Sequence, residues 1–137
     1  MRHGFVRAAA VTPAIRVGDV AYNADQIRKG MEEAERAGAS IVVFPELCIT
    51  GYTCSDLFLQ EVLLRRAKEE LLALAEETKG KELLVFVGLP LEVDGRLYNV
   101  AAVLHQGEVK AFIPKTFIPN YSEFYEVRHF TKGPSCP

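Results

Sequence analysis

The sequence lacks the features of disulfide-rich, zinc-binding, nucleic-acid-binding and membrane proteins. Its three cysteines include no CxxC pair, which argues against a disulfide framework and against a zinc site. A formal net charge of −2 offers no basic face for nucleic acid. No apolar run approaches the roughly 18 residues of a membrane span, and the N-terminus lacks the apolar stretch of a secretory signal. We therefore expect a cytoplasmic protein with no nucleic-acid partner, no membrane partner and no bound metal.

The composition is that of a soluble globular domain. Of the 137 residues, 49% are hydrophobic and 25% are charged, whereas a disordered chain would be less apolar and less balanced in charge. No repeat, low-complexity tract or linker divides the chain, so we expect a single domain unit.

Hydrophobic periodicity predicts that the chain opens with a strand, a helix and a strand. A strand over residues 5–11 reads as buried on both faces. A helix over residues 23–37 follows, with Asn23 as its N-cap and Gly38 at its C-terminal end. A second buried strand is expected over residues 40–44. This order is typical of a crossover unit with parallel strands.

The second half of the pattern predicts one more helix and a change to antiparallel pairing. Asp56 could cap a long helix that includes Val62, and a third strand is expected to end at Gly88 and Pro90. Gln106-Gly107 reads as the turn of a hairpin. The three later strands are expected over residues 83–89, 97–104 and 109–113. The predicted fold class is therefore α/β with a mixed sheet.

The last part of the sequence reads as irregular. Residues 114–137 are rich in aromatic and turn residues, and the final six supply neither a strand nor a helix. A layered α/β domain usually covers its last strand edge. We therefore interpret residues 1–137 as part of a larger domain.

Two charged residues directly follow predicted strands. Ligands of open α/β sheets gather at the carboxyl ends of strands. Glu46 follows one apolar strand, and partial burial there would favour a general base, although from the local pattern alone a loop cap or an ion pair with an arginine is the more common explanation. Lys115 follows another strand and could face a developing oxyanion, although by itself a surface lysine is the simpler interpretation. Together they could form half of a nucleophilic catalytic site.

Aromatic residues are clustered after Lys115. Aromatic walls with a few polar groups suit a small amphiphilic ligand, although a hydrophobic cluster under a loop is at least as common. The members of this cluster are Tyr121, Phe124, Tyr125 and Phe130, with Asn120, Glu123, Glu126 and Arg128 among them.

The cysteines and histidines show no catalytic or metal-binding pattern. No neighbouring histidine or helix N-terminus is evident that would activate Cys48, Cys54 or Cys136. Free cysteines most often act as small hydrophobic residues, and we assign all three to that class. The three histidines show no metal-ligand spacing.

Two ordered motifs resemble those of the carbon–nitrogen hydrolase (nitrilase) superfamily. IVVFPEL at 41–47 with TGY at 50–52 is similar to its glutamate motif, and PKT at 114–116 with PNY at 119–121 is similar to its lysine motif. Longer matches are similar to the glutaminase domain of glutamine-dependent NAD synthetases. They are GFVR at 4–7, TGYTCSDLF at 50–58 and NYSEFYE at 120–126, and the resemblance covers nearly the whole chain.

The resemblance implies a four-layer α-β-β-α sandwich with a glutamate–lysine–cysteine triad. Glu46 would be the general base and Lys115 the oxyanion stabiliser. A thiolate would attack the side-chain amide of glutamine and release ammonia, and the thioester would then be hydrolysed. The residues expected around the glutamine pocket or the ammonia exit are Tyr52, Tyr121, Phe124 and Glu126.

The resemblance also implies partners. The glutaminase domain needs no cofactor, and its ammonia passes to a C-terminal synthetase domain that uses ATP and Mg²⁺ to amidate deamido-NAD. Family members with this sandwich commonly assemble through large interfaces, so a homo-oligomer is expected.

The sequence departs from this pattern at the nucleophile. The family's cysteine lies on a later strand-to-turn element, beyond Pro137, and the synthetase domain is absent too. We therefore expect the chain alone to lack glutaminase activity. Two alternatives stay open: a free-standing amidase of the same superfamily, and a non-catalytic binding or assembly module. Glutamine binding without turnover would favour the module.

Overall fold

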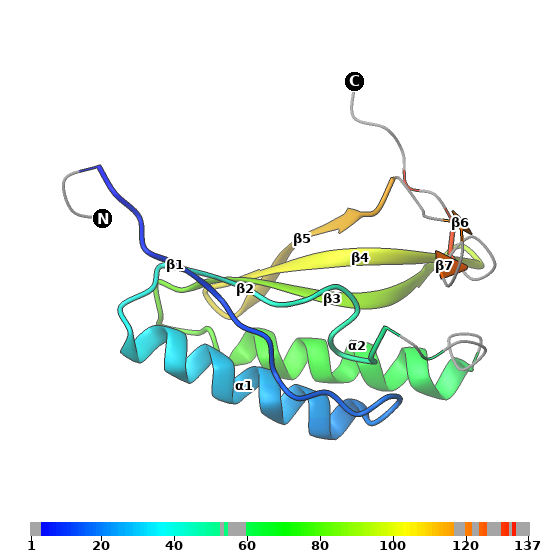
Figure 1. The fold of residues 1–137 in the computed structure, drawn as a ribbon, viewed down its shortest axis with the longest axis horizontal. Coiled ribbons are helices and arrows are strands. Elements are labelled where there is room, and N and C mark those ends of the chain that lie inside the picture. The colour runs from blue at the N-terminus through cyan, green and yellow to red at the C-terminus, as the bar shows by residue number, and fades with distance from the viewer. Residues whose placement is uncertain are drawn as a thin grey trace.

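The computed structural model describes residues 4–52, 54, 60–116, 120–121, 124–125, 130–131 and 133, with 120–121 and 124–125 described by their backbone only. Within them the elements follow in the order strand, helix, strand, helix and then five strands (Figure 1). Their bounds are β1 Ala8–Ala10, α1 Val20–Arg36, β2 Ile41–Val43, α2 Glu61–Glu76, β3 Leu84–Val93, β4 Arg96–His105, β5 Glu108–Pro114, β6 Asn120–Tyr121 and β7 Phe124–Tyr125.

The topology of the sheet places the C-terminal ends of β2 and β5 at the same end of the sheet. The five-stranded sheet has the order β1-β2-β3-β4-β5, in which β1, β2 and β3 are parallel neighbours. β4 runs antiparallel to β3, and β5 runs antiparallel to β4. Because two reversals restore the original direction, β5 points the same way as β2. The predicted α/β class with a mixed sheet is confirmed.

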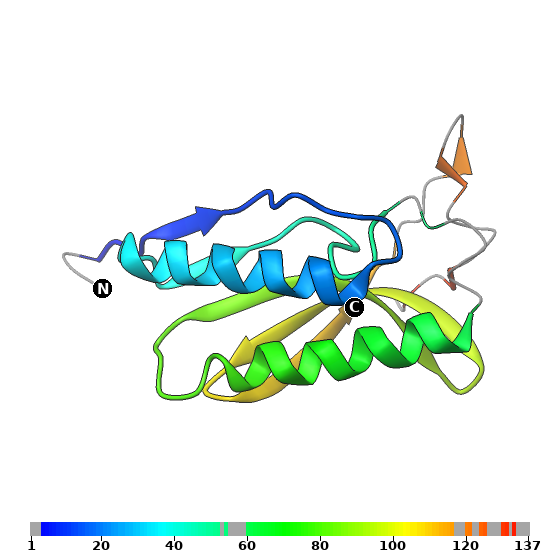
Figure 2. The ribbon, with the colours of Figure 1, turned by 90° about the horizontal axis from the view of Figure 1, so that it is seen from below.

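Both helices cover one face of the sheet. α1 and α2 lie on the same side of it in both ribbon views (Figures 1 and 2). The hydrophobic core lies between these helices and the sheet. Burial of each large aliphatic side chain there stabilises the fold by about 1.5–3 kcal/mol relative to its exposure. The core combines alternate strand residues with one stripe of each helix, including Val42, Val85, Val87, Leu104, Ile27, Met31, Leu71 and Leu74.

No described helix lies on the opposite face of the sheet (Figure 1). The register places Val43 beside Phe86, and Ala101 between Gly88 and Ile113. This face is apolar and accessible: the exposed fraction is 45% at Val43 and 53% at Ile113. The described residues therefore contain one helix layer and one sheet layer of the expected sandwich.

Helix α1 begins earlier than the sequence predicts. Its N-cap is Asp19, whose carboxylate accepts a hydrogen bond of 3.1 Å from the backbone N–H of Tyr22. Asn23, the predicted cap, is fully buried inside the helix. Its side chain bonds to both backbone groups of Arg16 and to the carbonyl of Ile49, so the cap prediction is wrong.

The C-terminal end of α1 and the second helix give mixed outcomes. Gly38, with φ of +79°, follows the C-cap as predicted. Helix α2 begins at Glu61 after Gln60, which makes no side-chain capping bond, while the predicted cap Asp56 lies outside the described residues. Val62 is 54% exposed and does not belong to the core.

Strand boundaries differ from the prediction at two places. β1 is three residues long and Phe5 is 79% exposed, so burial of this segment on both faces is wrong. β3 does not end at Gly88 and Pro90 but continues to Val93 and turns through Asp94-Gly95 into β4, a hairpin that the prediction missed.

The C-terminal half is otherwise close to the prediction. The hairpin at Gln106-Gly107 is confirmed, with both residues at positive φ. The stretch expected to be irregular contains the short hairpin β6–β7.

Candidate active site

Glu46 is presented by a tight turn after β2. The backbone N–H of Phe44 still bonds to the carbonyl of Phe86 at 2.9 Å, so the chain follows the sheet up to Pro45. Leu47 then adopts a left-handed conformation, with φ of 53°, and its side chain is fully buried. Its carbonyl accepts the N–H of Gly51 at 2.7 Å, which closes the turn. The carboxylate of Glu46 therefore lies just beyond the C-terminal end of β2.

Lys115 is held by backbone hydrogen bonds at the end of β5. Its N–H donates to the carbonyl of Asn99 at 2.8 Å, which extends the β4–β5 pairing by one residue. Its own carbonyl accepts the N–H of Gly133 at 2.8 Å. The strand and this later segment therefore fix the main chain from which the lysine side chain extends.

Glu46 and Lys115 meet, although 69 positions separate them in sequence. The ammonium nitrogen Nζ of Lys115 lies 2.6 Å from Oε1 of Glu46. The exposed fraction of the side chain is 41% for Glu46 and 29% for Lys115, so the glutamate is less buried than the sequence suggests. The structure brings these two strand-end residues together; their chemical roles stay predictions.

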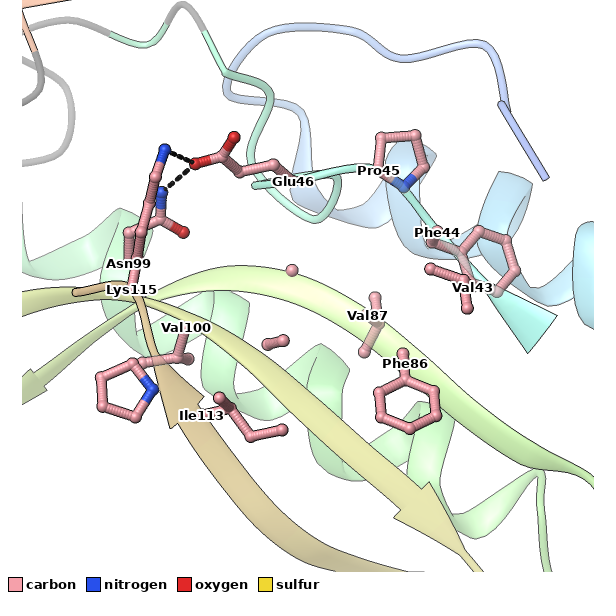
Figure 3. Close-up of a pocket in the computed structure, with 13 residues that line it drawn as sticks. Val43, Phe44, Pro45, Glu46, Phe86, Val87, Asn99, Val100, Ile113 and Lys115 are labelled. Atoms are coloured by element: carbon pink, nitrogen blue, oxygen red, sulfur yellow. Dashed lines mark hydrogen bonds and ion pairs between the residues drawn. The ribbon is translucent and has the colours of Figure 1, made fainter. Parts of the chain in front are cut away.

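Asn99 completes this cluster and was not anticipated. Its Nδ2 donates to the same Oε1 of Glu46 at 2.5 Å, and only 3% of Asn99 is exposed (Figure 3). Asparagine is rarely buried unless it is hydrogen-bonded. An asparagine within an otherwise apolar strand was the signal that could have identified it.

A pocket of about 450 Å³ lies beside this cluster on the open face of the sheet. Figure 3 shows the carboxylate, the ammonium and the amide gathered at one end, with apolar side chains along the rest. A small ligand with one polar end and an aliphatic stem suits such a pocket. The apolar lining includes Val43, Phe86, Val100 and Ile113.

Of the other predicted site residues, only Tyr52 has a described side chain. Tyr52 is half-buried and packs against the hydrophobic core, and the described residues that line the pocket do not include it. Tyr121 and Phe124 belong to the hairpin β6–β7, of which only the backbone is described. Glu126 lies outside the described residues. Their roles in binding substrate stay predictions.

Neither described cysteine has the properties of a nucleophile. Cys48 is 2% exposed, and burial raises the pKa of its thiol to about 12. Cys54 is 3% exposed, and burial also raises its pKa. Because the thiolate is the reactive form, both are inert near neutral pH, as the sequence indicated. Cys136 lies outside the described residues.

Comparison with known proteins identifies relatives along almost the whole chain. Residues 7–134 match the family model of carbon–nitrogen hydrolases. The glutamine-dependent NAD(+) synthetase of Mycobacterium tuberculosis is 40% identical over 132 residues, which are 96% of this chain and 19% of that protein. The enzyme of the same name from Aquifex aeolicus is 42% identical over 118 residues, 85% of this chain and 20% of that protein. The chain thus spans about a fifth of these curated relatives.

Solved structures agree with this fold. A glutamine-dependent NAD(+) synthetase from Cytophaga hutchinsonii superposes with a TM-score of 0.89 at 35% identity, over 94% of this chain and 22% of that one. An amidase from Nesterenkonia sp. has a TM-score of 0.81 at 24% identity over 98% of this chain and 51% of its own, which supports the fold alone. No helix among the described residues is long and apolar enough to cross a membrane. The expected nitrilase-like fold is confirmed, and the chain belongs to the carbon–nitrogen hydrolase family.

Proposed function

We propose that Glu46 and Lys115 form part of a glutaminase site that releases ammonia for the synthesis of NAD from deamido-NAD. The observation that carries this proposal is the ion pair of 2.6 Å between the two residues at the polar end of an apolar pocket. The relatives at about 40% identity are named glutamine-dependent NAD(+) synthetases, which supports glutamine as the substrate.

The carboxylate of Glu46 acts as the proton acceptor. A cysteine thiol transfers its proton to Glu46 while its sulfur forms a bond to the amide carbon of glutamine. The proton is then passed to the departing nitrogen, the carbon–nitrogen bond breaks, and ammonia leaves. Water then attacks the thioester carbon while Glu46 takes its proton, the carbon–sulfur bond breaks, and Glu46 returns the proton to the sulfur as glutamate is released. Glu46 thus serves both half-reactions.

Lys115 supplies positive charge next to the reacting amide. The amide oxygen gains negative charge in each tetrahedral intermediate, and a fixed cation in an apolar surrounding lowers the energy of that state. The ion pair with Glu46 and the backbone bond to Asn99 hold this cation before substrate arrives. A preorganised charge of this kind costs little reorganisation during the reaction.

The nucleophile of this mechanism is neither Cys48 nor Cys54. Both are buried with raised pKa values, and the described residues that line the pocket include neither of them. The thiol comes from the part of the glutaminase domain that lies after these residues in the family. The side chains proposed to complete the glutamine pocket or the ammonia exit are Tyr52, Tyr121, Phe124 and Glu126.

The proposed setting is a larger cytoplasmic enzyme. The glutaminase site itself uses no cofactor, and ATP and Mg²⁺ act in a separate synthetase domain that consumes the ammonia. The buried free thiols Cys48 and Cys54 suit a reducing compartment. The apolar open face of the sheet supports a homo-oligomer or a further layer of the same protein.

A chimera tests the proposal. In the Mycobacterium tuberculosis synthetase, the 132 residues that match this chain are replaced by the corresponding residues of this chain. NAD formation is then measured twice, with glutamine and with added ammonium salt as the nitrogen source. We expect the chimera to use both. A chimera that uses ammonium but not glutamine contradicts the proposal.

Point variants of the chimera identify the residues responsible. We expect Glu46→Gln and Lys115→Met to lower glutamine-dependent synthesis by about 100-fold or more, and to leave ammonium-dependent synthesis unchanged. Glu108→Gln and Lys110→Met are matched controls, because they remove a similar ion pair of 2.7 Å at the solvent-exposed start of β5. Equal effects in the two sets would contradict the assigned roles.

A further inference from the structure

One oxygen of Glu46 accepts two hydrogen bonds from different strands. Oε1 lies 2.6 Å from Nζ of Lys115 and 2.5 Å from Nδ2 of Asn99 (Figure 3). Within the part of the chain that the structure describes, Oε2 of Glu46 makes no hydrogen bond. The carboxylate is thus held at one oxygen and open at the other.

Asn99 also fixes the main chain of Lys115. The carbonyl of Asn99 accepts the backbone N–H of Lys115 at 2.8 Å, while its side chain reaches Glu46. One residue therefore sets the separation of the acid and the cation. Its own position is well determined, because it pairs with Pro90 in the middle of the sheet and is 97% buried.

We propose that Asn99 is a positioning residue for the pair Glu46–Lys115, an inference that rests on the glutaminase function proposed above. Its amide keeps Oε1 occupied and directs Oε2 to the thiol whose proton Glu46 accepts. In this proposal Asn99 takes part in no bond-making or proton-transfer step, and it acts through Glu46.

The chemistry of the asparagine side chain suits this role. The amide is a neutral donor, so it orients the carboxylate without neutralising its charge. A lysine or arginine at the same place would add a second cation to the one that Lys115 already supplies, and would weaken Glu46 further as a base. An aspartate would set a second carboxylate against the first, and a leucine would leave Oε1 with one donor fewer. A hydrogen bond to a charged group typically changes an equilibrium by tenfold or more.

Carboxylate labelling tests the proposal without requiring turnover. The 137-residue chain and its Asn99→Leu and Asn99→Asp variants are treated with a carbodiimide and a small amine, and labelling is measured by peptide mass spectrometry. The readout is the labelling rate of Glu46 divided by that of Glu32, an exposed residue on α1. We expect this ratio to rise by about tenfold in both variants, because Oε1 loses one of its two donors and keeps only Lys115.

Leu104→Ala is the matched control. Leu104 lies on the same strand and is fully buried, but it contacts the helix layer and does not line the pocket. Its loss destabilises the core and is expected to leave the Glu46 ratio unchanged. An unchanged ratio in both Asn99 variants overturns the proposal, and so does an equal rise in Leu104→Ala. If Asn99→Leu unfolds and labels at every carboxylate, Asn99→Asp, which keeps the side-chain volume, decides by the same criterion.

The chimera separates this inference from the proposed function. There, Asn99→Leu is expected to lower kcat for glutamine by about tenfold with a smaller change in KM, and to leave ammonium-dependent synthesis intact. If the parent chimera does not use glutamine at all, the glutaminase proposal fails while the labelling ratio still decides the role of Asn99. If the parent uses glutamine but the ratio does not move, only the positioning role is overturned.

Discussion

Gly88 lies directly against the backbone that carries Glu46. A Cβ atom at position 88 would overlap the backbone nitrogen of Leu47 and would lie 3.0 Å from the carbonyl oxygen of Pro45. The carbonyl of Gly88 also accepts the N–H of Ile49 at 3.2 Å. Strand β3 therefore supports the turn that presents the carboxylate, and the close approach requires glycine.

Substitution of Gly88 by alanine tests this support. The obstructing atoms are main chain and cannot rotate away, so we expect Gly88→Ala to lower the free energy of unfolding by about 1–3 kcal/mol. It should also weaken the contact between Glu46 and Lys115, seen as faster acetylation of Lys115. Urea unfolding gives the stability, and peptide mass spectrometry gives the acetylation rate.

Ala101 provides the matched control for this variant, because it pairs with Gly88 across β3 and β4. Ala101→Gly measures the intrinsic preference of a strand for alanine, which is about 0.5–1 kcal/mol. If close approach were unimportant, Gly88→Ala would stabilise the protein by a similar amount. If Gly88→Ala stabilised the protein and left the acetylation rate of Lys115 unchanged, β3 would not support the turn that presents Glu46.

The meeting of Glu46 and Lys115 was predictable from the sequence, whereas the role of Asn99 was not. Both charged residues directly follow apolar strands, and the strand ends of α/β sheets are where ligand groups gather. Asn99 lies inside a strand and contacts a residue 53 positions away. That contact depends on the register between β3 and β4, which was not predicted because the turn at Asp94-Gly95 was missed.

The cap of α1 shows the same limit of local patterns. Asp19 and Asn23 lie one helical turn apart, and both are residue types that cap helices. Only the tertiary structure distinguishes them, because Asn23 is buried against Ile49, which is distant in sequence. Strand boundaries failed for a related reason: Gly88 and Pro90 usually end strands, but here they lie inside β3.

The buried thiol of Cys48 is expected to make stability decrease at alkaline pH. Its pKa rises from an ordinary value of 9.0 to about 12 in the folded protein, because burial disfavours the thiolate. Unfolding above pH 9 therefore releases a proton that the folded state retains. Stability is fully present below pH 9 and is lost as the pH rises toward 12, by up to roughly 4 kcal/mol.

Denaturant unfolding across pH 8–11 checks this prediction, with Cys48→Ser as the comparison. Serine keeps a hydroxyl that can donate to the carbonyl of Gly88, as the thiol does at 3.7 Å, but it does not titrate in this range. The stability difference between the two proteins should therefore change with pH. Parallel curves would contradict the prediction.

The 137-residue chain alone is expected to show no glutaminase turnover. Cys48 and Cys54 carry raised pKa values and are inaccessible, so neither supplies a thiolate near neutral pH. The measurement is glutamate release by the purified chain, compared with the chain carrying Glu46→Gln. Release that depends on Glu46, or stoichiometric labelling of either cysteine by a glutamine-like diazoketone, would refute the prediction.

The open face of the sheet is expected to cause self-association of the isolated chain. Val43 and Ile113 are about half exposed on this apolar face, and the helices cover the other face. We expect Ile113→Lys to shift the sedimentation profile toward the monomer. Val62→Lys is the control, because Val62 lies on α2, away from the open face of the sheet, and is 54% exposed. It should leave the sedimentation profile unchanged. Equal effects of the two substitutions would locate the contact elsewhere.

Asn23 is expected to contribute more to stability than Asp19, the residue that caps the helix. Asn23 accepts the N–H of Arg16 at 2.7 Å and donates to the carbonyls of Arg16 and Ile49 at 2.8 and 3.0 Å. Asn23→Ala removes the donor to the buried carbonyl of Ile49, which costs about 1–3 kcal/mol, and two part-buried bonds to Arg16 are lost as well. Asp19→Ala removes an exposed capping bond and costs about 1 kcal/mol.

Urea unfolding of these two variants measures the difference directly. Asn23→Ala should also speed amide exchange at residues 47–51, because the bond to Ile49 ties α1 to the turn that follows Glu46. Asp19→Ala should speed exchange only in the first turn of α1. If Asp19→Ala were less stable than Asn23→Ala, the prediction would be contradicted. The turn that presents Glu46 would then depend on Gly88 and β3 and not on Asn23.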